Sequence, residues 1–134
     1  KLGIKIKKGM KIFWNRNRRF YLESQLKEDL YSYTVDIQSM LDQLFELGYK
    51  QDQSVSFDFS FVSSQLDNTL GLVNALKQRM VYDIEYSNAA GNYDVVGNIN
   101  ISLALEEIKS VVIEMCNLGY EFDSRITGYG VLKD

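Results

Sequence analysis

Carboxylate side chains alternate with apolar residues in several short segments of this sequence, and they are the groups best placed to do chemistry. In each segment the carboxylates share one parity, and aromatic or branched apolar residues dominate the other. The side chains in question are those of Asp58, Asp83, Glu85, Asp94, Glu121 and Asp123. Because successive residues of a strand point to opposite faces of a sheet, we expect these six carboxylates to gather on one face.

A set of oxygen atoms of this kind permits several kinds of site. Carboxylate clusters bind Mg²⁺ or Ca²⁺, but no loop of this sequence has a known ligand spacing for either ion. Paired carboxylates hydrolyse glycosides, but that reaction needs a cleft and one raised pKa, and a flat sheet face provides neither. Concentrated negative charge can instead attract a basic surface of another protein. Solvent-exposed carboxylates also serve solubility alone, and the sequence leaves that alternative open.

Other catalytic patterns are missing from the sequence. It contains no histidine, which is the commonest general base and metal ligand. Its single cysteine, Cys116, has no partner for an internal disulfide. No glycine-rich loop has the pattern that holds phosphate. We therefore expect a protein that is not an enzyme, uses no metal or cofactor, and works in the cytoplasm.

Charge is divided unevenly along the chain. Residues 1–19 hold 8 of the 15 basic residues, and the first acidic residue is Glu23. Residues 20–134 carry 7 basic and 18 acidic residues, a net charge of −11. A body with this charge repels nucleic acid and attracts basic surfaces. The basic segment, residues 1–21, also contains Phe13 and Trp14. It is a solvated tail, a contact with RNA or a membrane, or a tail that folds back on the acidic body.

The length of 134 residues suits one domain, which we place at residues 22–134 after the basic segment. Met10 is a candidate for the natural start of the protein. Removing residues 1–9 should then leave the fold intact. No apolar run approaches the roughly 20 residues that span a bilayer, so we expect no membrane insertion.

Strands must position the carboxylates, and the clearest of these is residues 55–62. Phe57, Phe59 and Phe61 share one parity there, with Asp58 on the other. Further strands are predicted at residues 81–87, 93–101 and 120–132, with helices at residues 64–80 and 103–118. In residues 81–87 the side chains of Tyr82, Ile84 and Tyr86 are expected to share a face.

An apolar stripe with spacings of three and four residues precedes the first strand. It predicts a long leading helix over residues 22–48 that ends at Gly48 in a left-handed conformation. Hydroxylic and β-branched residues make a break near residues 32–34 an alternative. A second glycine, Gly119, is expected to end the last helix in the same way. The stripe either packs on its own domain or forms an intermolecular coiled coil.

The order strand, helix, strand, strand, helix, strand from residue 55 is that of the ferredoxin-like, or split βαβ, arrangement. Two right-handed crossovers place both helices on one face of a four-stranded antiparallel sheet. We therefore predict an α+β protein of ferredoxin-like class (βαββαβ) with an added long N-terminal helix. The six carboxylates would lie on the face opposite the helices.

This order of elements resembles that of the bacterial regulators of ribonuclease E activity, type B, over residues 22–132. Three features carry the resemblance. They are a capped helix, residues 64–80, directly after the strand 55–62, the run Tyr120-Glu121-Phe122-Asp123 after the last helix, and the glycine-flanked Tyr129. That family has a glycine-tryptophan-glycine step right after the aspartate, where this chain has Ser124-Arg125-Ile126. The basic start also differs from the family. The resemblance implies a regulator that acts by binding a ribonuclease.

We predict a non-catalytic regulator or inhibitor that binds a basic surface of a ribonuclease or another RNA-processing protein through the six carboxylates. One alternative is an immunity protein that neutralises a cognate nuclease toxin. A second is a nucleic-acid-binding module that uses the basic segment, although acidic sheet positions disfavour base stacking. The sequence names neither the partner nor the oligomeric state.

Overall fold

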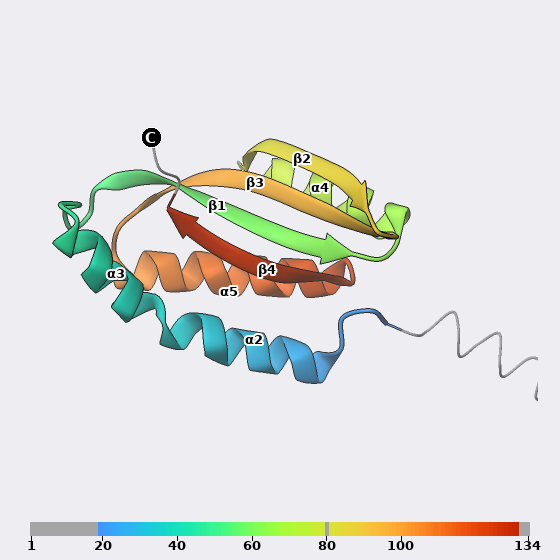
Figure 1. Ribbon diagram of the computed structural model, residues 1–134, viewed down its shortest axis with the longest axis horizontal. Helices are drawn as coiled ribbons and strands as arrows, with labels where there is room; N and C mark the ends of the chain where they lie inside the picture. Colours follow the sequence, from blue (N-terminus) through green and yellow to red (C-terminus); the bar gives the residue numbers. More distant parts are fainter. Residues whose placement is uncertain (1–18, 80, 132–134) are drawn as a thin grey trace, which may run out of the picture.

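The computed structural model describes residues 19–79 and 81–131, which form four helices and one sheet of four strands (Figure 1). In chain order these are α2 (Glu23–Val35), α3 (Ile37–Glu46), β1 (Ser54–Ser63), α4 (Leu66–Gln78), β2 (Tyr82–Ala89), β3 (Asn92–Ser102), α5 (Leu105–Glu121) and β4 (Ser124–Val131). Residues 1–18, which make up nearly all of the basic segment and include Phe13 and Trp14, lie outside the described residues. The prediction that residues 1–9 can be removed therefore concerns residues that are not described.

The sheet has the strand order β2-β3-β1-β4, and every neighbouring pair is antiparallel. The α+β class and the four-stranded antiparallel sheet are therefore confirmed. Helix α4 connects β1 to β2, which lie on either side of β3, and α5 connects β3 to β4, which lie on either side of β1. Each crossover thus joins two parallel strands that have a third strand between them.

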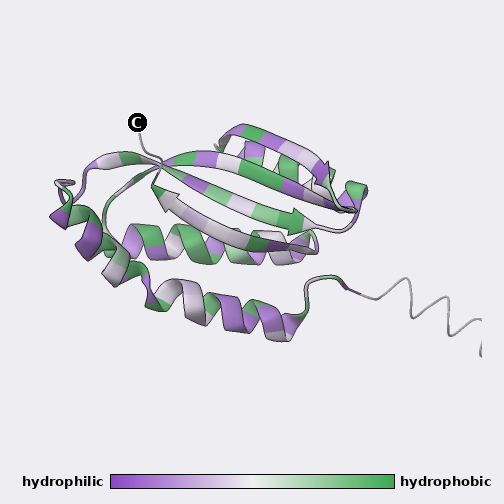
Figure 2. Ribbon diagram, viewed as in Figure 1, coloured by the Kyte–Doolittle hydropathy of each residue, from purple (hydrophilic) through white to green (hydrophobic). Residues whose placement is uncertain are grey.

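The aromatic face of β1 forms the centre of the core. Phe57, Phe59 and Phe61 are each at most 2% exposed. They belong to one cluster with side chains from β3, α4 and α5, including Val95, Ile101, Leu72, Leu76, Val112 and Met115. Hydrophobic and hydrophilic residues alternate along the central strands (Figure 2). The predicted parity of β1 is therefore confirmed.

The leading segment is two helices with a break at Asp36, two residues after the stretch 32–34 where a break was expected, so residues 22–48 are not one continuous helix. α2 ends at Val35, and α3 begins at Ile37 after Asp36. The Thr34 hydroxyl donates to the Leu30 carbonyl at 2.6 Å, a side-chain bond that competes with regular helix geometry. The apolar stripe packs on its own domain, since Ile37 is buried in the core. Gly48 has a φ of +106°, which confirms the predicted left-handed end.

The end of α5 differs most from the sequence prediction. The helix continues through Gly119 to Glu121, and β4 begins only at Ser124. Gly119 is buried where the helix meets the sheet: a Cβ there would lie 2.6 Å from the Ser124 carbonyl oxygen and 3.3 Å from the Phe61 ring. This glycine permits close packing and does not end the helix.

Strand β2 contains a bulge that changes its parity. The register shifts between Tyr82 and Glu85, and Asp83 has a φ of +52°. Before the bulge Tyr82 lies opposite Asn98, and after it Tyr86 lies opposite Val95. Because Asn98 and Val95 are on opposite faces of β3, the predicted shared face for Tyr82 and Tyr86 is wrong.

Candidate functional site

The sheet face opposite α4 and α5, called the open face below, is the candidate site because none of the described helices covers it (Figure 1). The strand register assigns to it Tyr82, Glu85 and Ser87 of β2, Asp94, Val96, Asn98, Asn100 and Ser102 of β3, Ser54, Ser56, Asp58, Ser60 and Val62 of β1, and Arg125, Gly128 and Gly130 of β4. Most of these residues are serine, asparagine or glycine. The open face is therefore polar, and it is mostly uncharged.

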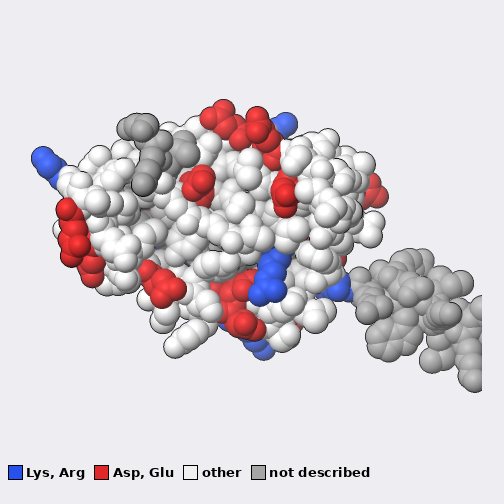
Figure 3. All heavy atoms as spheres, in the orientation of Figure 1, with Lys and Arg blue, Asp and Glu red and all other residues white. Residues whose placement is uncertain are grey.

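Three of the six predicted carboxylates lie on the open face, and all three are exposed: Asp58, Glu85 and Asp94. Glu85 lies opposite Val96, two residues from Asp94. The two are therefore diagonal neighbours, a relationship that typically separates residues by about 7–8 Å. Figure 3 shows separate acidic groups on this side of the molecule, with uncharged surface between them.

The other three carboxylates lie elsewhere, so the expectation that all six share one face is wrong. Asp83 occupies the β2 bulge, and Glu121 is the last residue of α5. Asp123 precedes β4 and accepts hydrogen bonds from the backbone N–H groups of Phe20 and Tyr21 at 2.9 and 2.8 Å. The two physical causes are the extension of α5 past Gly119 and the bulge in β2.

A partly buried ion pair lies at the β4 edge and was not predicted. Asp29 on α2 is 6% exposed and accepts hydrogen bonds from Arg125 Nε and Nη2 at 3.0 and 2.9 Å. These bonds raise the pKa of Arg125. The Tyr21 hydroxyl donates to Asp29 at 2.5 Å, and burial together with this bond raises the pKa of Tyr21. The sequence held one signal: Asp29 falls on the apolar stripe of the leading helix, three residues after Leu26.

The ion pair affects the charge of the open face. Arg125 is the only basic residue that the register places there, and its guanidinium is paired with Asp29 on α2. Its charge is therefore balanced by Asp29, so the net charge of the open face stays negative.

Polar side chains on the open face hydrogen-bond to one another across strands. The Tyr82 hydroxyl lies 2.6 Å from Ser56 Oγ on β1 and donates to Asn100 Oδ1 at 3.1 Å. Thr127 Oγ1 donates to Ser60 Oγ at 2.8 Å. Within the described part of the chain, no group of three or more Asp, Glu or Cys residues could hold a metal ion. These contacts connect polar side chains of neighbouring strands across the open face.

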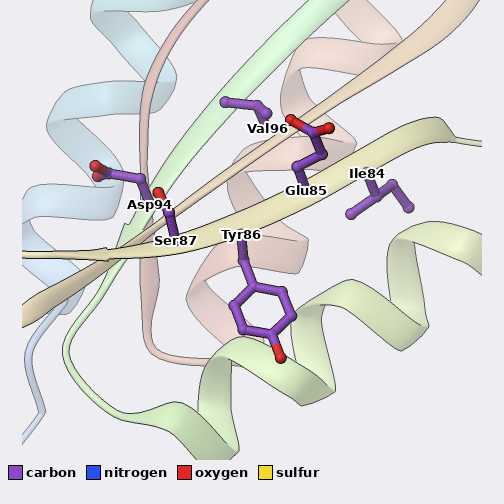
Figure 4. A pocket seen from close by; sticks show the side chains of 6 residues that line it. All are labelled: Ile84, Glu85, Tyr86, Ser87, Asp94 and Val96. Carbon is purple, nitrogen blue, oxygen red and sulfur yellow. The ribbon is translucent and has the colours of Figure 1, made fainter.

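Strand β2 lies at the edge of the sheet beside a shallow depression of about 430 Å³. Its lining residues are Ile84, Glu85, Tyr86, Ser87, Asp94 and Val96. Figure 4 shows Tyr86 pointing toward α4, while the Glu85 and Asp94 carboxylates lie on the other side of the strand. The depression therefore follows the strand edge and is not an enclosed cavity.

Comparison with known proteins adds no assignment. No protein-family model matches the sequence, and no curated protein matches it. Of the helices described here, none is both long enough and apolar enough to cross a membrane. The function must be argued from the residues of the chain itself.

Proposed function

We propose that this chain is a non-catalytic regulator or inhibitor that binds a basic surface of a ribonuclease or another RNA-processing protein through its open face. The observation that carries this proposal is the charge of that face. It presents the exposed carboxylates of Asp58, Glu85 and Asp94, and its basic residue Arg125 is paired with Asp29. The net charge of −11 over residues 20–134 adds long-range attraction for a basic partner.

We infer that the fold is of the ferredoxin-like class. Counted from the other edge, the strand order is β4-β1-β3-β2, and each crossover spans one intervening strand, as a split βαβ unit requires. The leading helices α2 and α3 are an addition that packs against α5. This order of elements also supports the resemblance to regulators of ribonuclease E activity, type B. Ribonuclease E is therefore the first partner to test.

The nucleic-acid alternative gains no support from the open face. Its exposed aromatic side chain, Tyr82, is hydrogen-bonded to Ser56 and Asn100. Arg125, the basic residue that the register places on this face, is on β4 at the opposite edge of the sheet and is paired with Asp29. In proteins that bind RNA by stacking its bases on a sheet, exposed aromatic side chains lie beside basic residues. A basic protein surface fits these contacts better. A cytoplasmic location, where RNA processing takes place, is part of the proposal.

The test compares two triple variants of the full chain. The first is Asp58→Asn, Glu85→Gln and Asp94→Asn, which neutralises the open face. The control is Asp42→Asn, Glu46→Gln and Asp67→Asn, which removes three exposed carboxylates from helices. Binding to purified ribonuclease E is followed by stopped-flow fluorescence at low and at physiological ionic strength, together with inhibition of RNA cleavage.

The open-face variant should associate about tenfold more slowly than the control variant at low salt, because it lacks the charges that speed encounter. Added salt should reduce this difference, since exposed charges are screened within about 8 Å at physiological ionic strength. Dissociation should change less. Equal association rates for the two triple variants would contradict the role of the open face. Absence of binding by the unaltered chain would contradict ribonuclease E as the partner.

A further inference from the structure

Strand β2 has a free edge, and this edge differs from the opposite edge of the sheet. Seven of its eight residues are exposed, and Ile84 is the exception. At the other edge α2 lies beside β4, where the Tyr33 hydroxyl donates to the Ile126 carbonyl at 3.3 Å and the Tyr129 hydroxyl donates to the Tyr33 carbonyl at 2.8 Å. A side chain of α2 thus occupies one backbone carbonyl at the β4 edge, whereas among the described residues no side chain hydrogen-bonds to the β2 backbone, so we consider the β2 edge for pairing with a further strand.

The side chains that follow the bulge differ between the two faces of β2. Glu85 and Ser87 lie on the open face, with Asp94 of β3 beside them. Ile84 and Tyr86 lie on the helix side, where Tyr86 is 47% exposed (Figure 4). An added strand would place alternate side chains on the two faces. One set would meet carboxylates, and the other set would meet an apolar surface.

We propose that the free edge of β2, residues 84–89, takes an extended segment of the basic partner as a further strand, and that basic and apolar residues alternate in that segment. This inference rests on the proposed function and specifies which part of the partner is recognised. Hydrogen bonds between main chains would provide affinity, and the alternate side chains would provide specificity.

Charge selects this occupant over a second copy of the chain. Two β2 edges in contact would bring the Glu85 and Asp94 carboxylates of both copies together, and like charges on neighbouring strands are destabilising. The bulge at Asp83 also interrupts the regular edge at its start, which limits pairing between copies. Lysine or arginine side chains on an incoming strand would instead be attracted.

The test uses the full chain and two synthetic peptides of equal composition and charge. The probe is acetyl-Lys-Val-Lys-Val-Lys-Val-amide, and the control is acetyl-Lys-Lys-Lys-Val-Val-Val-amide. The alternating peptide should bind about tenfold more tightly, because only it places every lysine on the carboxylate face. It should also slow hydrogen exchange of β2 amides and leave the exchange of β4 amides unchanged.

Two variants, each with a matched control, separate strand addition from simple charge attraction. Tyr86→Ser should lower the affinity for the alternating peptide several-fold, whereas Tyr31→Ser, which changes a 71% exposed tyrosine on α2, should not. Glu85→Lys should also weaken binding, and Asp67→Lys on α4 should not.

Equal affinity for the two peptides, or no effect of Tyr86→Ser, would overturn strand addition and leave the open-face proposal standing. Slowed exchange in β4 in place of β2 would also overturn it. Glu85 and Asp94 belong to both surfaces, so the two proposals are distinguished by their probes. Failure of the open-face proposal is read from the triple variants with ribonuclease E, and failure of strand addition is read from the two peptides.

Discussion

The carboxylate of Asp29 and the guanidinium of Arg125 form a two-point hydrogen-bonded pair that ties α2 to β4. The residues are 96 positions apart in the sequence, and the Asp29 side chain is 9% exposed. The pair is one contact between the leading helices and the body of the protein, beside the packing of α2 and α3 on α5. It also balances the one basic residue that the register places on the open face.

Replacing Arg125 by methionine should lower the free energy of unfolding by about 3 kcal/mol, because the Asp29 carboxylate would remain buried without a cation. Arg79→Met is the control: Arg79 Nε lies 3.5 Å from Glu114 Oε2, and both side chains are more exposed. That change should cost less than about 1 kcal/mol. Urea unfolding followed by circular dichroism measures both. Equal losses would show that the buried pair contributes no more than a surface pair.

Phe59→Ala should destabilise the protein by about 3–5 kcal/mol, because it opens a cavity at the centre of the sheet. Phe59 is 2% exposed and contacts the Phe57 ring, with a centroid separation of 5.5 Å. Val96→Ala on the open face, where the valine is 42% exposed, should cost less than about 1 kcal/mol. Chemical unfolding of both variants provides the comparison. A small loss for Phe59→Ala would mean that this position is not part of the core.

Gly119→Ala should lower stability by about 1–3 kcal/mol even though alanine favours a helix. Its Cβ would lie 2.6 Å from the Ser124 backbone oxygen, so α5 or the start of β4 must shift. At Gly128 the nearest atom to an added Cβ is Ser60 Oγ at 3.7 Å, and Gly128→Ala should change stability by only about 0.5 kcal/mol. Thermal unfolding of the two variants tests this. A raised midpoint for Gly119→Ala would contradict the close packing.

Stability should decrease at alkaline pH. Burial raises the pKa of the Cys116 thiol from 9.0 to about 12 and that of the Tyr129 hydroxyl from 10.0 to about 12. A raised pKa in the folded state means that the unfolded chain releases its proton first. The stabilising contribution is therefore complete below the usual values and is lost as the pH rises toward about 12. The midpoint of urea unfolding should fall as the pH rises toward about 12, and it should fall less steeply in Tyr129→Phe than in the unaltered protein. An identical slope would contradict the effect of burial on Tyr129.

The sequence by itself determined the features that depend on local periodicity. The alternation of Phe57, Phe59 and Phe61 defines a strand with one buried face, because adjacent side chains of a strand point in opposite directions. The α+β class and the antiparallel sheet follow from the order of such elements. Gly48 was predictable because a helix end with positive φ favours glycine whatever surrounds it.

Only the tertiary structure decided which residues share a surface. Gly119 has the local pattern of a helix stop, yet contact with Phe61 and Ser124 makes it a packing position inside α5, and Glu121 is then helical. The bulge at Asp83 depends on how β2 pairs with β3. Asp29 became a buried ion-pair partner through contact with Arg125, 96 residues away. Local periodicity describes neighbours along the chain, and it carries no information about contacts between residues so far apart.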